Sequence, residues 1–442
     1  MAHGGRATRR AALVAVVRSP DLLRLALVRF AGQFGDGMFQ AALSGAILFN
    51  PERATDPLAI AGGFTVLLLP YSVIGPYAGA LLDRWDRRTV LLVANLLRAV
   101  LIATTAAGLL GGIEDTPLLL LALAVVGISR FVLAGVSASL PRVLKQAWLV
   151  PMNSVLATVA SGCAGAGAAI AVAIIGAIGS GDLASAVAVA ASASGSVIGA
   201  LAATRFAARR LGPEPGEASA VSSLRAILSG LRTGARAVWA SRECTTAMIG
   251  IGVHRIVFGA NTLLMVLVLR RGPADGVSLS SGLIGFGVAI TAVASGMLAA
   301  AVVAPLLIPR LGRPRTVVVG LLTAIAVQLV LVSPITVATG EAERRAHHLL
   351  LIGAFLIGLA GQTIKLTGDA TMQIDIDDSR RGQVFALQDT VFNITFVLAI
   401  AATAMVIPID GRSLPVVLAG AGIYGLGIMA VAANTRRRIV TR

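Results

Sequence analysis

The chain has 442 residues, of which 56% are hydrophobic and 13% are charged, and its mean hydropathy is +0.86. Soluble globular proteins carry about 25% charged residues, so this composition excludes an ordinary soluble fold and indicates an integral membrane protein with many spans. The formal net charge of +16 does not point to a nucleic-acid partner, because the basic residues are scattered through short loops without interleaved aromatic residues.

The sequence also lacks the patterns of a metal or nucleotide site. Its 4 His and 2 Cys residues show no metal-ligand spacing. The phosphate-binding loop Gly-x-x-x-x-Gly-Lys-[Ser/Thr] is absent, so nothing indicates an ATP-binding domain. We therefore expect no metal and no cofactor. A membrane-embedded enzyme would need a clustered nucleophile and base, and His254 has no evident partner of this kind, so we expect no enzymatic activity.

A transmembrane helix needs about 20 mostly apolar residues. Twelve segments meet this requirement, so we predict an all-α integral membrane protein with 12 transmembrane helices in two pseudo-symmetric six-helix bundles. The predicted spans are 22–49, 58–82, 89–110, 117–141, 152–179, 183–205, 244–269, 280–308, 316–338, 347–374, 382–408 and 414–434.

The Lys and Arg residues predict the orientation of these spans. With the N-terminus inside and Arg205 counted with the loop that follows it, the cytosolic segments hold 25 basic residues and the external loops hold 6. Cytosolic loops carry the excess of Lys and Arg, so we expect a multi-pass protein of the plasma membrane with both termini in the cytosol.

A polar linker divides the spans into two groups of six. We predict a cytosolic tail, an N-terminal bundle, a linker, a C-terminal bundle and a second tail at 1–21, 22–205, 206–243, 244–434 and 435–442. Within the linker, apolar residues recur at steps of mostly 3 and 4 between Arg225, Arg232 and Arg236. This pattern predicts a basic amphipathic helix at 221–240 that lies on the inner leaflet and contacts anionic lipids.

Two segments indicate that the second bundle repeats the first. Leu307–Val317 reads L-I-P-R-L-G-R-P-R-T-V and echoes Leu81–Val90, which reads L-L-D-R-W-D-R-R-T-V. The same register, an offset of 226 residues, maps Arg29 in the first span onto Arg255 in the seventh. Two matches at equivalent places of the six-span units predict a parallel internal repeat.

The loop between the second and third spans, 79–88, reads G-A-L-L-D-R-W-D-R-R. It resembles the loop motif G-x-L-x-D-R-x-G-R-R of the major facilitator superfamily, although Asp86 stands where that family usually has Gly. The resemblance implies two bundles that rock around a central substrate site, and a loop whose charges hold one state closed. Orientation of the protein in the membrane is the alternative role of these charges. The loop residues that we expect to form this gate are Gly79, Asp83, Arg84, Arg87 and Arg88.

Residues 361–396 resemble the corresponding region of actinobacterial members of the drug- and macrolide-efflux branch of this superfamily. That resemblance implies proton-coupled efflux of a small amphipathic or hydrophobic compound by a secondary transporter. The fifth span lacks the Gly-Pro that usually ends a Gly-rich motif in antiporters of the family. A lipid or lysolipid translocator is the main alternative, and a membrane-embedded sensor or enzyme is an alternative of another class. We expect a monomer.

The first span carries a polar stripe in an otherwise apolar helix. Arg29, Gln33, Asp36 and Gln40 follow one another at steps of 4, 3 and 4 and therefore share one helical face. Charged groups are costly inside a membrane, so we expect this face to line a cavity, with a structural polar seam as the alternative. We predict that Asp36 binds and releases the transported proton and that its contact with Arg29 changes as it does so.

Further polar residues within the spans complete the predicted coupling and substrate cavity. Arg98 is expected either to line the cavity or to extend to the membrane interface. The region around Arg130 partly resembles the family's fourth-helix motif, whose Arg is associated with proton coupling. Lys365 and Asp369 lie one turn apart and can pair. Basic residues outnumber acidic ones in the spans, which favours an anionic substrate. The full predicted set is Arg29, Gln33, Asp36, Gln40, Arg98, Arg130, Arg255, Asn261, Lys365, Asp369, Asp389 and Asn393.

Overall fold

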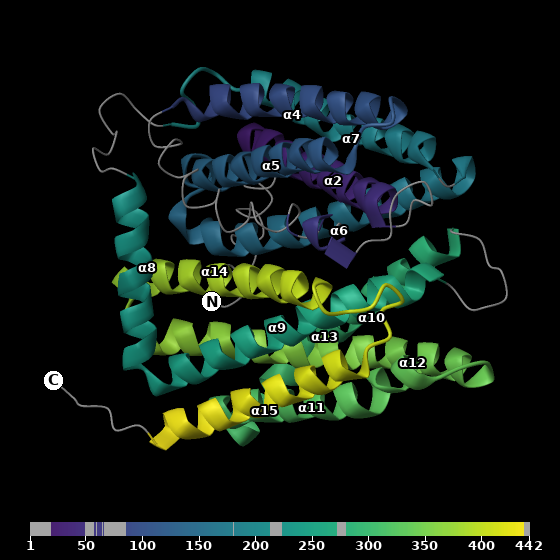
Figure 1. Cartoon of the computed structure of the whole chain (residues 1–442). Coiled ribbons are helices and arrows are strands. Elements are labelled where there is room, and N and C mark those ends of the chain that lie inside the picture. The colour runs from purple at the N-terminus through teal and green to yellow at the C-terminus, as the bar shows by residue number, and fades with distance from the viewer. Residues whose placement is uncertain are drawn as a thin grey trace, which may run out of the picture. The chain divides into compact units, whose positions relative to one another are not determined.

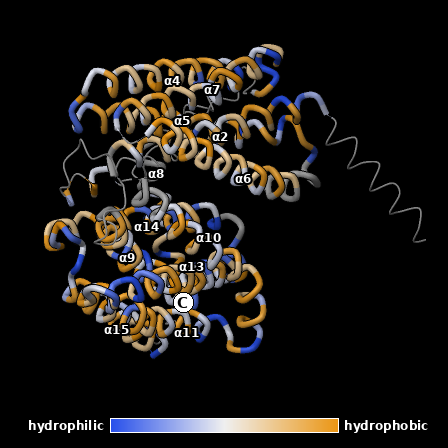
Figure 2. The backbone as a smooth tube through the Cα atoms, turned by 90° about the vertical axis from the view of Figure 1, so that its right-hand side faces the viewer, coloured by the Kyte–Doolittle hydropathy of each residue, from blue (hydrophilic) through white to orange (hydrophobic). Residues whose placement is uncertain are grey.

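The fold was described from a computed structural model, which places residues 19–48, 57–58, 60–63, 65, 85–179, 181–212, 223–271 and 280–436. These residues are almost entirely α-helical and contain no β-strand. Ten of their helices are long and apolar enough to cross a membrane. Hydrophobic residues run along the helices, and hydrophilic residues gather at the helix ends (Figure 2). The predicted class, an all-α integral membrane protein, is therefore confirmed for the described residues.

The described chain forms two compact units. One comprises Met1–Arg53 with Val73–Ser223, and the other comprises Ala54–Ser72 with Leu224–Arg442. The helices of the first unit are α2 (Pro20–Leu48), α4 (Arg87–Leu110), α5 (Asp115–Val143), α6 (Gln146–Ile178) and α7 (Asp182–Thr204), as labelled in Figure 1. Each begins and ends within six residues of a predicted span. Most of the second predicted span, 58–82, lies outside the described residues.

Helix α2 packs against both α6 and α7. Small residues allow this close approach. A Cβ added at Gly37 of α2 would overlap the backbone oxygen of Ala164, and one added at Gly167 of α6 would overlap that of Phe34. Glycine lets helix backbones approach closely in membranes. The helix that carries the polar stripe is therefore packed closely against its neighbours. The polar residues of that stripe also explain why α2 is less apolar than the ten candidate spans.

The second unit contains a further series of helices. They are α8 (Ser223–Ala240), α9 (Arg242–Arg271), α10 (Ser280–Leu311), α11 (Arg313–Val327), η1 (Gln328–Val332), α12 (Pro334–Val337), α13 (Glu341–Asp375), α14 (Asp378–Ala404) and α15 (Leu414–Arg436). The ninth predicted span, 316–338, is thus not one regular helix. Pro334 has no N–H to continue the α-helical ladder, and the N–H of Ser333 bonds to the oxygen of Gln328, five residues back, which forms the π-helical segment η1.

The predicted amphipathic helix of the linker corresponds to α8. Part of its apolar face packs within the second unit, since Ala237 and Val238 are buried in the core cluster of that unit. Arg232, Arg236 and Trp239 are exposed. The helix therefore has one face committed to the protein, and the side chains suited to lipid headgroups lie on the other.

Candidate functional site

A buried ion pair joins α2 and α4 in the first unit. The guanidinium Nη1 of Arg98 lies 3.3 Å from Oδ1 of Asp36, and their side chains are 1% and 8% exposed, respectively. Both charges stand near the middle of their helices, where water is largely excluded. Such a pair is retained only when the remaining donors and acceptors of both groups also find partners.

Hydrogen bonds from two further helices provide these partners. The hydroxyl of Ser129 on α5 donates to Asp36 at 2.6 Å, and Arg98 donates from Nη1 to the same hydroxyl at 3.2 Å. Arg98 also donates from Nε to Ser196 on α7 at 2.7 Å and from Nη2 to the oxygen of Gly32 at 3.3 Å. We call this set, Asp36, Arg98, Ser129, Ser196 and the Gly32 carbonyl, the buried ion-pair network.

Small residues make room for this network. A Cβ at Gly35 would lie 3.2 Å from Nη2 of Arg98 and 2.7 Å from the backbone oxygen of Ser192. Glycine at this position therefore lets α2 approach α7 while the guanidinium passes between them. Gln33 adds a bond from its side-chain amide to Oδ2 of Asp36 at 3.0 Å. The carboxylate is thus held by side chains from three helices of one unit, α2 itself included, and Arg98 links the network to a fourth, α7.

Asp36 has a different ion-pair partner from the one that its spacing along α2 suggests. The ion pair that the structure gives Asp36 is with Arg98 on another helix, and not with Arg29 on its own helix. Arg29 stands two turns away along α2, about 10 Å, which is too far for direct contact along a straight helix. Arg98 is buried within the protein and does not extend to the membrane interface. Arg29, Gln40 and Arg130 are partly exposed.

In the second unit, the predicted pair of Lys365 and Asp369 is present. The ammonium group of Lys365 donates to Oδ2 of Asp369 at 2.8 Å, one turn along α13. Gln388 of α14 donates to the other carboxylate oxygen at 2.6 Å. Both charged side chains remain partly exposed, at 29% and 23%. This cluster links α13 to α14 while leaving polar atoms accessible.

Arg255 stands in a different environment. Its guanidinium carbon lies 3.7 Å from the ring centre of Phe392 and 4.4 Å from that of Phe396, both on α14. Phe258, one turn along α9, contributes a third ring at 5.2 Å. Nε donates to the backbone oxygen of Phe392 at 3.1 Å. We call Arg255 and these three rings the arginine–phenylalanine cluster.

The remaining predicted residues of the second unit have local partners. Asn261 and Gln328 exchange hydrogen bonds between their amides at 2.8 and 3.0 Å, which ties α9 to the start of η1. Asn393 donates to the backbone oxygen of Asp389 within α14 at 2.9 Å, and the Asp389 side chain is exposed. None of these hydrogen bonds joins the arginine–phenylalanine cluster.

One buried polar contact of α9 was not predicted from the sequence. His254 is buried, and its Nδ1 lies 3.2 Å from the hydroxyl of Tyr424 on α15. A Cβ at Gly361 of α13 would overlap the imidazole Nε2, so this glycine makes the space for the ring. Ser129 and Ser196 were also missed, because each lies in a helix with several serines and nothing in the spacing singles it out.

Only part of the predicted gate loop can be placed. Gly79, Asp83 and Arg84 lie outside the described residues. Arg87 donates to the backbone oxygen of Ala138 at 3.0 Å, and Arg88 to that of Thr204 at 3.5 Å. Asp86 forms the N-cap of α4: its carboxylate accepts from the N–H of Arg88 at 3.2 Å and from the hydroxyl of Thr89 at 3.0 Å. This residue, which departs from the family pattern, therefore fixes the start of the helix.

The second copy of the loop is fully described. Arg313 begins α11 and bonds to Glu243 at 2.6 Å and to Asp375 at 2.8 Å. These carboxylates belong to the start of α9 and the last turn of α13, so one guanidinium ties three helix ends together. Ser241 also donates to Asp375 at 3.1 Å.

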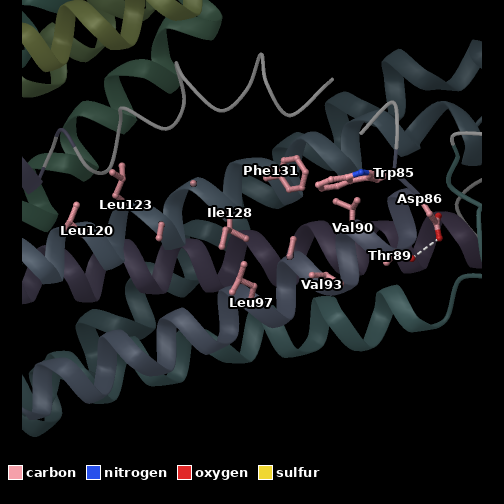
Figure 3. A pocket seen from close by; sticks show the side chains of 13 residues that line it. Trp85, Asp86, Thr89, Val90, Val93, Leu97, Leu120, Leu123, Ile128 and Phe131 are labelled. Atoms are coloured by element: carbon pink, nitrogen blue, oxygen red, sulfur yellow. Dashed lines mark hydrogen bonds between the residues drawn. The ribbon is translucent and has the colours of Figure 1, made fainter. Parts of the chain in front are cut away.

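A groove of about 930 Å³ runs between α4 and α5 in the first unit. Figure 3 shows its apolar side chains along the two helices, with Trp85, Asp86 and Thr89 at one end. None of the predicted cavity residues lines it. Among the residues whose placement is described, no group of three His, Cys, Asp or Glu side chains could hold a metal ion.

A family model, curated proteins and solved structures all match this chain to membrane transporters. Residues 25–400 match the family described as Major Facilitator Superfamily. Two proteins called uncharacterized MFS-type transporters, from Mycobacterium bovis and Mycobacterium tuberculosis, are each 42% identical over 428 residues, which cover 93% of this chain and 91% of theirs.

Solved transporters share the fold at much lower identity. The nucleoside transporter NupG superposes with a TM-score of 0.64 at 15% identity, over 94% of this chain and 99% of that one. A bacterial homologue of the iron transporter ferroportin, in an inward-facing state, gives a TM-score of 0.61 at 14% identity, over 96% and 100%. At such identities the likeness concerns the fold alone.

Proposed function

Because the chain belongs to the Major Facilitator Superfamily of membrane transporters, we propose that it couples proton movement to the efflux of a small amphipathic or hydrophobic compound by alternating access. In this proposal it acts as a monomer in the plasma membrane with both termini in the cytosol, and it performs no bond-making chemistry. The efflux direction rests on the resemblance of residues 361–396 to drug- and macrolide-exporting members of the family.

The buried ion-pair network is the observation that supports proton coupling. Asp36 is the one carboxylate in it, and an ionisable group at this depth is costly unless it serves a function or a partner. When Asp36 is ionised, it pairs with Arg98 and accepts from Ser129. When it is protonated, the attraction to Arg98 is lost, and the carboxyl group can itself donate a hydrogen bond.

The network accommodates both protonation states. Arg98 keeps its bonds to Ser196 and to the Gly32 oxygen when the charge of Asp36 is neutralised, so its own charge is still solvated by the protein. Protonation would thereby weaken the link between α2 and α4 without leaving a buried cation unsatisfied. A group that binds a proton in one arrangement of helices more tightly than in another can shift the balance between two transport states.

The exposed face of α8 supports a role for the inner leaflet. Arg232 and Arg236 present positive charge, and Trp239 is an amphipathic ring suited to the headgroup region. We infer that anionic lipids of the cytosolic leaflet contact this face. In the same proposal, the charges at 79–88 hold one transport state closed, with Arg87 and Arg88 anchored to backbone oxygens of α5 and α7.

Transport by purified protein in liposomes tests the proposal. An imposed pH gradient should drive accumulation of a lipophilic probe by the wild type, and Asp36→Asn should abolish the dependence on the gradient. Asp21→Asn, which changes a more exposed carboxylate at the start of α2, is the matched control and should transport normally. Gradient-driven transport that Asp36→Asn leaves unchanged would contradict the role of Asp36.

A lipid or lysolipid translocator is the second candidate. It is favoured by Arg255, a cation of the second unit that contacts aromatic rings instead of a carboxylate. Parallel assays with a fluorescent anionic lysophospholipid and with tetraphenylphosphonium, a lipophilic cation, separate the two. Transport of the lysophospholipid alone favours translocation of lipids, and transport of the cation alone favours export of drug-like cations.

A further inference from the structure

In the arginine–phenylalanine cluster, the terminal nitrogens of Arg255 have no hydrogen-bond acceptor among the described residues. An arginine side chain carries N–H donors on Nε and on both terminal nitrogens. Only Nε of Arg255 has a hydrogen-bond partner among the described residues, the backbone oxygen of Phe392. The ring faces of Phe392 and Phe396 stabilise the positive charge, but they do not engage the terminal N–H groups as an oxyanion would.

Two other cations within the predicted spans, Arg98 and Lys365, are each neutralised by a carboxylate. Arg98 lies 3.3 Å from Asp36, and Lys365 lies 2.8 Å from Asp369. No carboxylate of the described chain comes within 4.0 Å of Arg255, although Asp389 stands on α14 one turn before Phe392. Arg255 is also partly exposed, whereas Arg98 is buried. The cluster therefore presents a positioned, uncompensated charge that a ligand can reach.

We propose that the terminal nitrogens of Arg255 bind the carboxylate or phosphate headgroup of an amphipathic substrate. The planar guanidinium matches such groups with two parallel hydrogen bonds. The stacked rings hold it in one orientation and supply an apolar surface beside the headgroup. This inference rests on the proposed transport function and adds to it the chemical class of the cargo, an amphipathic anion.

Binding of matched probes tests this site directly. The probes are a dansyl-labelled undecanoic acid and its methyl ester, which differ only in the charge of the headgroup. Wild-type protein in nanodiscs of neutral lipid is titrated with each probe, and the signal of empty nanodiscs is subtracted. The variants are Arg255→Gln, Arg255→Lys and, as a control for the loss of one charge at an exposed site, Arg310→Gln.

We expect the wild type to bind the acid more tightly than the ester. In Arg255→Gln the dissociation constant of the acid should rise roughly tenfold to a hundredfold, the range of a lost charge-assisted hydrogen bond, while that of the ester stays constant. Arg255→Lys keeps the charge without the planar fork and should lose part of the effect. Arg310→Gln should match the wild type. Equal binding of acid and ester by the wild type, or equal losses for both probes in Arg255→Gln, would overturn the anion site.

Two further experiments distinguish a lipid headgroup from a free amphiphile as the bound anion, and test the anion site separately from proton coupling. Competition by phosphatidylglycerol in the nanodiscs identifies a lipid headgroup as the natural anion, and absence of competition identifies a free amphiphile. Liposome transport then distinguishes the failures. Binding of the acid that depends on Arg255, without any proton-driven transport, would refute coupling and keep the anion site. Proton-driven transport of the acid that Arg255→Gln leaves unchanged would refute the anion site alone.

Discussion

Removing Arg98 alone from the buried ion-pair network should destabilise the protein more than removing both of its charges. At an effective dielectric constant of about 20, unit charges 3.3 Å apart attract each other by about 5 kcal/mol. Desolvation of the two side chains, which are 1% and 8% exposed, offsets much of that attraction. The net value of the pair is therefore small, but a charged Asp36 left without Arg98 has no such compensation, and its burial costs about 3–5 kcal/mol.

The assay compares Asp36→Asn, Arg98→Met and the double variant in detergent, by the fraction that remains monodisperse after heating. For a unit of roughly 200 residues, a loss of about 3 kcal/mol lowers the melting temperature by about 6–12 °C. We expect Arg98→Met to show such a fall, because Asp36 then keeps its charge without a counter-ion. The double variant should recover most of it, so the cycle should give a coupling energy of about 2 kcal/mol or more.

An exposed ion pair provides the control for this cycle. Asp21 and Arg24, one turn apart at the start of α2, have side chains 20% and 40% exposed. Their single and double variants should stay within about 1 kcal/mol of the wild type, as surface pairs generally do. If the losses at Asp36 and Arg98 simply add in the double variant, the two charges do not act as a unit and the reasoning about the network fails.

Three other substitutions test the packing and capping that position the sites. Gly167→Ala should destabilise the protein strongly, because its Cβ would overlap a backbone oxygen of α2. Gly165→Ala places its Cβ in open space and should be neutral or slightly stabilising. Heating assays on the two variants compare them directly. Asp86→Ala should cost about 1 kcal/mol through loss of the α4 cap, and Asp86→Ser should retain most of the stability in the same assay. Gly361→Ala should displace His254 and lower the melting temperature by several degrees, and an unchanged melting temperature would show that the imidazole has room to move.

The fold was predictable because hydrocarbon imposes its own pattern on the sequence. A span must be about 20 apolar residues long and must satisfy its backbone within the helix, so composition alone locates it. The exceptions have local causes. At 316–338 the helix contains a π-helical segment, because Pro334 lacks the donor that a regular α-helix needs there. In α2, the polar stripe makes the helix less apolar than its neighbours.

The candidate site was only partly predictable. Spacing along one helix shows which residues share a face, and it identified Asp36. It does not show which neighbouring helix that face meets. The partner, Arg98, was assigned two competing roles because its pairing depends on how closely α2, α4 and α7 approach one another. That approach is set by Gly35 and other small residues, which carry no chemical signal of their own. Ser129 and Ser196 became meaningful only once their neighbours were known.

The internal repeat preserves positions more strictly than it preserves chemistry. The offset of 226 residues maps Arg87 onto Arg313, and each begins a helix and ties it to other helix ends of its own unit. Arg87 does so through backbone oxygens, whereas Arg313 uses the carboxylates of Glu243 and Asp375.

Near the middle of the helices, equivalent positions of the repeat carry different chemical groups. The same offset maps Asp36 onto Thr262, whose hydroxyl bonds to an oxygen of its own helix at 2.7 Å and joins no ion pair. It also maps Arg29 onto Arg255, the charge held by three aromatic rings. The position that Asp36 shares with Thr262 therefore holds a carboxylate with a counter-ion in the first unit only, and Arg255 of the second unit is a cation that no carboxylate of the described chain neutralises. This asymmetry favours a division of roles in which Asp36 of the first unit binds the proton and Arg255 of the second binds an anionic cargo, because Asp36 has a buried counter-ion and Arg255 has a charge that no carboxylate of the described chain neutralises.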